Sequence, residues 1–233
     1  MKRKELKLVI RKPISIREKV YKVIRNDILE SRIPPGARMI ETQLAKQINT
    51  SRTPVREALH MLEMEGLLEA IPRVGYRVKQ IYWDELVEIT EIRTVNEILA
   101  ARWAMKRITP EDILALEKNL LVAETEIRQG NPRSFVERDA EFHEILVRAS
   151  GSKRLLELCQ LLRRHMLRYR IEALYLPETG LRAIGEHRRI LECMRAMDEK
   201  GVETAIREHL EQAKREIERH AFGKDTRSKD RSV

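Results

Sequence analysis

Aromatic residues make up only 4% of this 233-residue chain, which also has just 9 glycines and 8 prolines. So few turn-forming residues argue against a fold of many short strands and favour long helices. The chain has only two cysteines, Cys159 and Cys193. This excludes a disulfide framework and a zinc module built on cysteines, and we expect both thiols to pack as small apolar groups.

Long apolar runs are also missing. Near the N-terminus, the stretch Leu6 to Ile10 is short and interrupted by Lys7. It is too short for the hydrophobic region of a secretory signal, and no run approaches the length that spans a membrane. We therefore expect a cytoplasmic protein without a membrane partner.

Positive charge is concentrated in the first third of the chain. Residues 1–80 hold 18 Lys and Arg against 9 Asp and Glu, whereas residues 81–233 hold 28 of each. The whole formal excess of +9 thus belongs to one part of the chain. A basic unit joined to a neutral one indicates that the basic unit meets a polyanion, although a solvated surface is the alternative.

The spacing of apolar residues predicts three helices and a hairpin in residues 15–80, after a basic arm at 1–14. Ser15 suits the N-cap of a first helix, and a second helix, near 41–48, is expected to turn Ile48 inward. A third helix, 52–65, has an inner face formed by Val55, Leu59 and Leu62. Residues 67–71 and 76–78 alternate as strands do, so the whole pattern predicts a winged helix-turn-helix.

The start of the third helix has the chemistry of a DNA-reading surface. Arg52 and Arg56 lie one turn apart with Thr53 beside them, and Arg can bind guanine or phosphate in the major groove. Arg73 in the wing can reach phosphates or the minor groove, and Gly75 permits the tight turn. Other basic residues would contact DNA phosphates and make the binding affinity depend on salt concentration; they are Lys2, Arg3, Lys4, Lys19, Lys22 and Arg25.

The run LAKQINTSRTPVREALHMLEMEGLL, from Leu44 to Leu68, resembles the signature of the GntR family of bacterial regulators. The resemblance implies operator contacts by Arg52, Thr53 and Arg56. Thr42 stands where the family often has Arg, so one DNA contact of the family is absent and the operator is expected to differ.

From Asp84 onward the pattern is helical, and the fold class is therefore mainly α. An antiparallel bundle of six helices is predicted for residues 84–222, followed by a flexible tail at 223–233. The expected helices are 84–107, 110–129, 132–149, 153–175, 180–199 and 202–222.

Four polar residues fall on the apolar faces of these helices. Asp139 and His143 are four residues apart and share a face, while His187 and His209 interrupt the apolar faces of two later helices. Each histidine alone could be a core imidazole bonded to a carbonyl. Together, the four side chains can be mutual partners through a metal ion.

Arg93 lies on a stripe of the first long helix that is expected to face inward, together with Leu86, Ile89, Asn96, Ala100 and Trp103. An inward Arg requires an anion. Glu97, four residues on, is one candidate partner, and a small-molecule carboxylate is the other.

The stretches 91–97, 139–143, 186–190 and 207–210 resemble the FCD effector domain of the FadR branch of GntR regulators, in its six-helix, VanR-like form. The resemblance implies a divalent ion held by Asp139, His143, His187 and His209, and an organic acid held by that ion and Arg93. Zinc is the expected ion, with Ni, Mn and Fe as alternatives. Asn96 replaces a commonly apolar position, which would alter the pocket.

The sequence therefore predicts a homodimeric regulator, a repressor of transcription that binds a palindromic operator and responds to a small carboxylate. One rival is a metalloenzyme, but no inward Glu or Asp is expected beside the four ligands as a general base. The other rival is an architectural DNA-binding protein whose helical part is purely structural.

Overall fold

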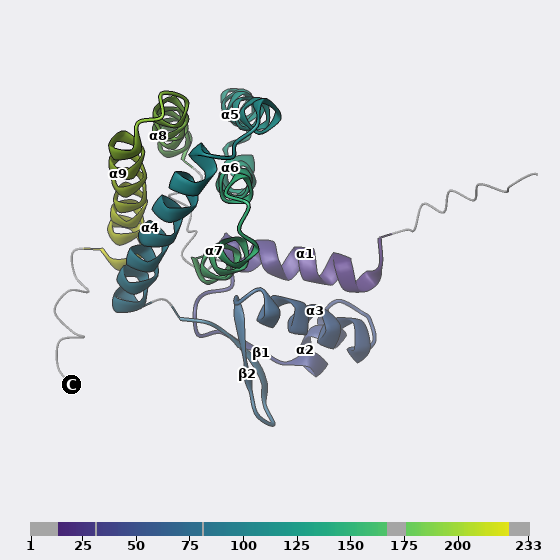
Figure 1. Cartoon of the computed structure of the whole chain (residues 1–233). Coiled ribbons are helices and arrows are strands. Elements are labelled where there is room, and N and C mark those ends of the chain that lie inside the picture. Colours follow the sequence, from purple (N-terminus) through teal and green to yellow (C-terminus); the bar gives the residue numbers. More distant parts are fainter. Residues whose placement is uncertain (1–13, 31, 81, 167–175, 224–233) are drawn as a thin grey trace, which may run out of the picture.

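A computed structural model describes residues 14–30, 32–80, 82–166 and 176–223 as a small N-terminal unit and a larger helical one (Figure 1). The predicted fold class is confirmed, since a winged helix-turn-helix precedes a bundle of helices. Lys2, Arg3 and Lys4 of the predicted arm lie outside the described residues, as does the predicted tail beyond Gly223.

The N-terminal unit contains three helices and a small sheet. Its helices are α1 (Ile16–Leu29), α2 (Glu41–Gln47) and α3 (Arg52–Met64). Its strands, β1 (Arg38–Met39), β2 (Leu68–Ile71) and β3 (Gly75–Val78), form an antiparallel sheet in the order β1-β3-β2. The sequence pattern misses β1, because two residues are too few to show alternation.

Local chemistry explains the boundaries of these helices. The Ser15 side chain accepts a hydrogen bond from the Glu18 backbone, and the Glu18 side chain accepts one from the Ser15 backbone. This reciprocal capping box fixes the start of α1. The prediction that Ile48 faces inward is wrong, since 44% of the residue is exposed. Because α2 ends at Gln47, Ile48 is its C-cap and leaves the helical face.

The second unit consists of six helices. Their bounds are α4 (Trp83–Met105), α5 (Pro110–Arg128), α6 (Phe135–Ala149), α7 (Lys153–Met166), α8 (Pro177–Arg195) and α9 (Glu199–Ile217). A 3₁₀ turn, η1 (Pro132–Ser134), precedes α6, and a π-helical turn, η4 (Glu218–Phe222), follows α9. The predicted continuation of α7 to 175 lies outside the described residues. None of the described helices is both long enough and apolar enough to cross a membrane.

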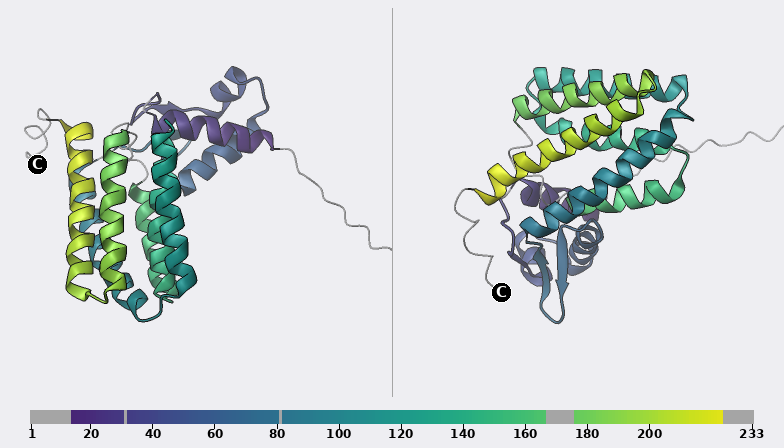
Figure 2. Two further views of the ribbon diagram at one scale, coloured as in Figure 1. Left: turned by 90° about the horizontal axis from the view of Figure 1, so that it is seen from above. Right: turned by 60° about the vertical axis from the view of Figure 1, so that its left-hand side comes forward.

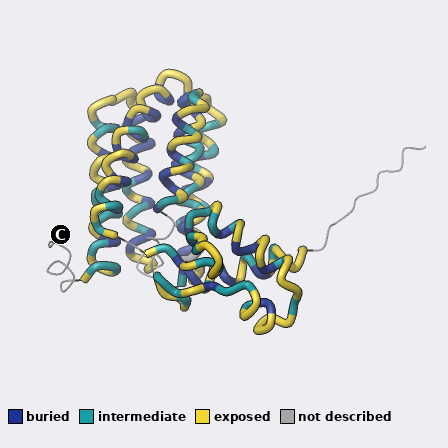
Figure 3. Tube along the Cα trace, turned by 90° about the horizontal axis from the view of Figure 1, so that it is seen from below, coloured by how far each residue is buried: buried dark blue, intermediate teal, exposed yellow. Residues whose placement is uncertain are grey.

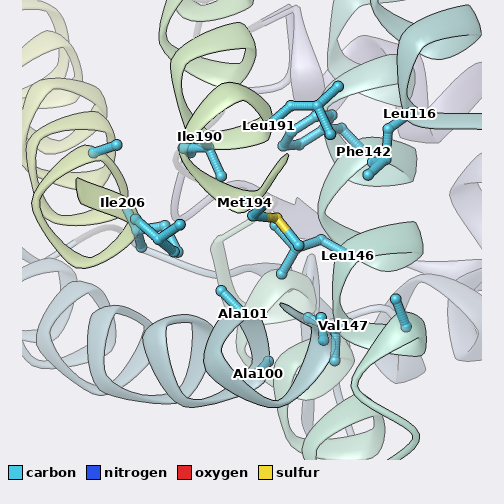
Figure 4. Close-up of a cluster of buried hydrophobic side chains, with 14 of the residues drawn as sticks. Ala100, Ala101, Leu116, Phe142, Leu146, Val147, Ile190, Leu191, Met194 and Ile206 are labelled. Carbon is cyan, nitrogen blue, oxygen red and sulfur yellow. The ribbon is translucent and has the colours of Figure 1, made fainter. Parts of the chain in front are cut away.

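The bundle is closed by a core of buried apolar residues. In Figure 3 the buried positions lie on the sides of the helices that face one another. Figure 4 draws 14 of these side chains, and those that it labels come from α4, α5, α6, α8 and α9. On α4 the predicted inward stripe is wrong at Trp103, which is 39% exposed, and Asn96 is only half-buried. The buried positions Glu97 and Ala104 continue the inner face instead. Both sets of positions fit the 3.6-residue period, so the packing of α4 on its neighbours decides between them.

The N-terminal unit lies against one side of the bundle, beside α7 (Figures 1 and 2). The backbone carbonyl of Arg164 is 3.6 Å from where a Cβ on Gly66 would lie. Gly66 follows directly after the end of α3. A cleft between the units is lined by residues of α1, α6 and α7, among them Arg25 and Arg163. The helix with the candidate DNA contacts thus ends at the bundle.

Candidate metal centre and nucleic-acid interface

Three helices bring the four predicted ligands together inside the bundle. Asp139 and His143 come from α6, His187 from α8 and His209 from α9. One ligand atom of each lies within 4.8 Å of all the others. The three histidines are buried and Asp139 is partly exposed.

The three imidazoles point the same ring nitrogen at a common centre. Nε2 of His209 is 3.2 Å from Nε2 of His187 and 3.3 Å from Nε2 of His143. Oδ1 of Asp139 is 3.6 Å from Nε2 of His187 and 3.7 Å from Nε2 of His143. Ligands about 2.0–2.1 Å from a tetrahedral ion are roughly 3.3 Å from one another, so the spacing fits a small divalent cation.

Two carboxylates, the buried Glu97 and the partly exposed Glu186, orient two of the imidazoles. Glu97 Oε2 is 2.8 Å from Nδ1 of His143, and Glu186 Oε2 is 2.8 Å from Nδ1 of His209. A neutral imidazole that donates from Nδ1 presents the Nε2 lone pair. Lone pairs that converge at hydrogen-bonding distance repel each other unless a proton or cation lies between them. The donor set therefore fits a metal ion, with the carboxylate-to-histidine support that is usual behind metal ligands.

Burial and the neighbouring charges shift the pKa values of two of the histidines in opposite directions. Burial, reinforced by neighbouring His209 and His143, lowers the pKa of His187 well below its ordinary value, so this imidazole stays neutral. Burial also acts to lower the pKa of His143, but the carboxylates of Glu97 and Asp139 outweigh it and raise that pKa. Burial opposes ionisation of Glu97, yet His143 and Arg93 lower the pKa of this carboxyl far below its usual range.

Glu97 and Glu186 correct one expectation from the sequence, which placed no inward carboxylate beside the four ligands. The sequence spacing predicts Glu97 only as a partner of Arg93 on the same helix. Its contact with His143 arises from the packing of α4 against α6, which the spacing does not show. Glu186 is adjacent to His187 in the sequence but reaches His209 on another helix. Both carboxylates accept hydrogen bonds from imidazoles.

Arg93 pairs with Glu97, one of the two anionic partners that the sequence predicts for it. Its Nε and Nη2 atoms lie 3.1 and 2.9 Å from Glu97 Oε1. Arg93 also lines a cavity of about 70 Å³ beside the cluster, together with Asp139, Glu186 and His209. The Arg93 side chain therefore borders both a buried carboxylate and a space for a ligand.

The predicted DNA contacts lie on the exposed side of the N-terminal unit. Arg52, Thr53 and Arg56 at the start of α3 are all exposed. Glu41 on α2 holds both arginines, with Oε2 at 3.0 Å from Arg56 Nη2 and 3.5 Å from Arg52 Nη2. Hydrogen bonding to Arg56 lowers the pKa of Glu41. The two guanidiniums are thus held side by side on one surface. Thr42, where the family often has Arg, is also exposed.

The wing carries the other two predicted residues. Arg73 is exposed at the tip, with a φ of 65°. Gly75 has a φ of +135°, and a Cβ there would lie 2.7 Å from the Met39 carbonyl oxygen, so the position requires glycine. Sequence reasoning missed Arg38, which is exposed on β1 and pairs in register with Arg77 of β3. Two further arginines are thus adjacent in the sheet.

A winged helix-turn-helix joined to a helical domain with an interior cavity and a histidine cluster defines a class of two-domain DNA-binding regulators. Residues 16–78 match the model of the bacterial regulatory proteins of the gntR family, and residues 88–212 match the FCD domain. The chain belongs to the GntR family of transcriptional regulators, with an FCD domain as its C-terminal part.

Known proteins resemble the chain along most of its length. The chain is 31% identical over 205 residues to the uncharacterized HTH-type transcriptional regulator YdhC of Bacillus subtilis, covering 85% of this chain and 89% of that protein. It is 28% identical to the HTH-type transcriptional repressor RspR of Escherichia coli, covering 84% and 86%. The solved structure of E. coli McbR/YncC has the same fold, with a TM-score of 0.71, 24% identity, and 90% and 100% of the two chains covered.

The buried position of Glu97 generates a stability prediction for the chelator-treated protein. Glu97→Gln removes the charge that faces Arg93 and His143, and we expect the free energy of unfolding in urea to fall by about 3–5 kcal/mol. Glu203→Gln is the matched control, because its ion pairs with Arg102 and Arg207 lie at the surface and are partly exposed, so that they should contribute no more than about 1 kcal/mol. Equal losses in the two variants would contradict the role given to Glu97.

Proposed function

We propose that this regulator is a homodimeric repressor whose affinity for a palindromic operator is controlled by a small organic acid, bound at a metal-containing pocket of its helical domain. The observation that carries the proposal is the convergence of three imidazole Nε2 atoms and one carboxylate beside a cavity lined by Arg93. Two relatives named as repressors support the sign of regulation, RspR of E. coli and a probable D-xylose operon repressor of Paenarthrobacter nicotinovorans.

For DNA binding, we place the start of α3 in the major groove. Arg52, Thr53 and Arg56 are exposed there, and the two guanidiniums can bind guanine edges or phosphates. Arg73 extends from the wing, which Gly75 shapes, toward the neighbouring backbone or minor groove. Two copies related by a twofold axis would occupy half-sites about one helical turn apart. A regulator of this kind works where the chromosome is, in the cytoplasm.

For effector binding, we assign Asp139, His143, His187 and His209 as metal ligands. Three nitrogens and one oxygen favour Zn²⁺, with Ni²⁺, Mn²⁺ and Fe²⁺ as alternatives. When bound, the ion offers positive charge and open coordination positions to carboxylate oxygens. The Nε and Nη2 atoms of Arg93 donate to Glu97. Its Nη1 atom remains to pair with the carboxylate of the effector. The proposed chemistry is reversible binding, not turnover.

An exposed apolar stripe on α4 supports the homodimer. Ile92, Val95, Leu99 and Trp103 follow one another at steps of three and four residues, and Val95 is 66% exposed. Steps of this size place side chains on one face of a helix. The neighbouring α7 also exposes Leu158 and Leu161. Large apolar surface of this kind is typical of a protein–protein interface, and we assign it to a second copy of the chain.

The metal assignment predicts the metal content of two histidine variants. Mutation of a residue that hydrogen-bonds to a metal ligand costs roughly 10–100-fold in metal affinity. Because His187→Ala removes a ligand itself, it should lose the ion under conditions in which wild type stays loaded. Elemental analysis after dialysis measures this. His60→Ala, on the exposed side of α3, is the control and should match wild type. Equal metal content in all three proteins would overturn the assignment.

The DNA assignment predicts that Arg56→Ala weakens binding to an operator selected from a random-sequence pool by about 10- to 100-fold, the equivalent of one specific base contact. The thermal midpoint should not change, because the side chain is exposed. Gel shifts measure the affinity. Arg148→Ala removes an equally exposed arginine from the bundle and should bind as wild type does. Retained affinity in Arg56→Ala would exclude its proposed contact.

The dimer assignment predicts that a charge on the α4 stripe separates the two copies. Val95→Glu should shift the mass in sedimentation equilibrium from two chains toward one, because a buried carboxylate without a partner opposes association. Leu121→Glu makes the same change at a similarly exposed leucine of α5 and should leave the dimer intact. If Leu121→Glu dissociates the protein and Val95→Glu does not, the interface lies elsewhere.

A further inference from the structure

The cavity beside the histidine cluster has a second arginine, which the metal assignment does not use. Arg182 on α8 lines this cavity, as Arg93 on α4 does. Its apolar lining residues come from α6, α7, α8 and α9; they include Phe135, Val136, Met166, Ala183, Leu210 and Ile217. The carboxylates of Asp139, Glu186 and Glu216 also line it. The cavity therefore has cationic groups from two helices, acidic groups that already have protein partners, and apolar walls between them.

Arg182 is held by a carboxylate that has other partners. Glu216 is nearly buried, and its Oε1 atom accepts hydrogen bonds from Arg182, from Arg219 Nη2 at 2.6 Å and from Gln212 Nε2 at 3.0 Å. Three donors thus share one oxygen. If Arg182 moved away, Glu216 would keep one guanidinium and one amide, so its charge would stay neutralised inside the protein.

The two cavity arginines therefore differ in how readily they can move. Arg93 is nearly buried, and it is the guanidinium that neutralises Glu97, deep inside the bundle. Arg182 is 43% exposed, and its partner does not depend on it. Arg182 can therefore leave Glu216 at little cost, and a planar carboxylate in the cavity matches its fork of donors best.

We propose that the effector is a short dicarboxylate, and that Arg182 is the residue that selects for its second carboxylate. This inference rests on the proposed function, which places the first carboxylate at the metal ion and Arg93. The second carboxylate takes Arg182 from Glu216, while Arg219 and Gln212 keep Glu216 satisfied. Apolar walls between the two ends suit the methylene groups of such an acid.

The size of the cavity limits the length of the acid. A water needs roughly 10–15 Å³ of this kind of volume, so a cavity of about 70 Å³ holds on the order of five to seven water-sized groups. A four-carbon chain with an acid at each end is of this order. Long-chain fatty acids and phosphorylated sugars exceed it.

Succinate and butyrate test the proposal, because they share a four-carbon chain and differ in one carboxylate. Their affinities are measured by isothermal titration calorimetry with the zinc-loaded, full-length protein. We expect wild type to bind succinate at least about tenfold more tightly than butyrate, the equivalent of one charge-assisted hydrogen bond. Arg182→Gln should reduce this preference to within about twofold and leave butyrate binding unchanged.

Arg219→Gln is the matched control, since Arg219 binds the same Glu216 oxygen but does not line the cavity. It should keep the preference of wild type, and Arg182→Lys should restore part of it. Equal loss of both acids in Arg182→Gln, or the same change in Arg219→Gln, would show a structural role and overturn the proposal. If wild type binds neither acid but loses zinc on His187→Ala, the dicarboxylate assignment fails and the metal site stands.

Discussion

Glu97 carries a negative charge into the interior of the helical domain, where it meets His143 from α6 and Arg93 from its own helix. Removing such a group from water costs several kcal/mol, and only well-placed partners offset that cost. Because Glu97 Oε2 lies 2.8 Å from Nδ1 of His143, the opposite nitrogen of that ring is directed at His209. The orientation of His143 in the candidate site thus depends on this carboxylate, and the buried charge of Arg93 depends on it too.

The four candidate ligands could be predicted from the sequence because each is a local anomaly. A histidine or aspartate in an apolar stripe is visible within its own helix, and a spacing of four residues places Asp139 and His143 on one face. The residues that orient them have no such local mark. Glu97 and Glu186 contact histidines on other helices. Which histidine each one reaches depends on how the helices pack, and sequence spacing alone does not show this.

The same limit explains the errors in the N-terminal unit and on α4. The amphipathic pattern of α3 predicts its buried face, because thirteen residues give several turns of periodicity. The two-residue strand β1 has no period at all, and Ile48 loses its inward position because the helix ends one residue earlier. The spacing of α4 predicts Trp103 on the inward stripe, but this residue is 39% exposed. On the proposed function it belongs to the face that pairs with a second copy, and aromatic residues are enriched at such interfaces.

On the proposed function, the candidate site connects to the DNA-binding unit through a short chain of contacts. Asp139 precedes Ala140, whose carbonyl oxygen accepts a hydrogen bond of 2.8 Å from Arg163 on α7. The adjacent Arg164 carbonyl faces Gly66, directly after α3. Arg163 is nearly buried, so it has little freedom to absorb a shift of α6 without moving α7. A ligand acts on operator affinity only if it binds two arrangements unequally, and these contacts give such a difference a route to the helix that carries Arg52 and Arg56.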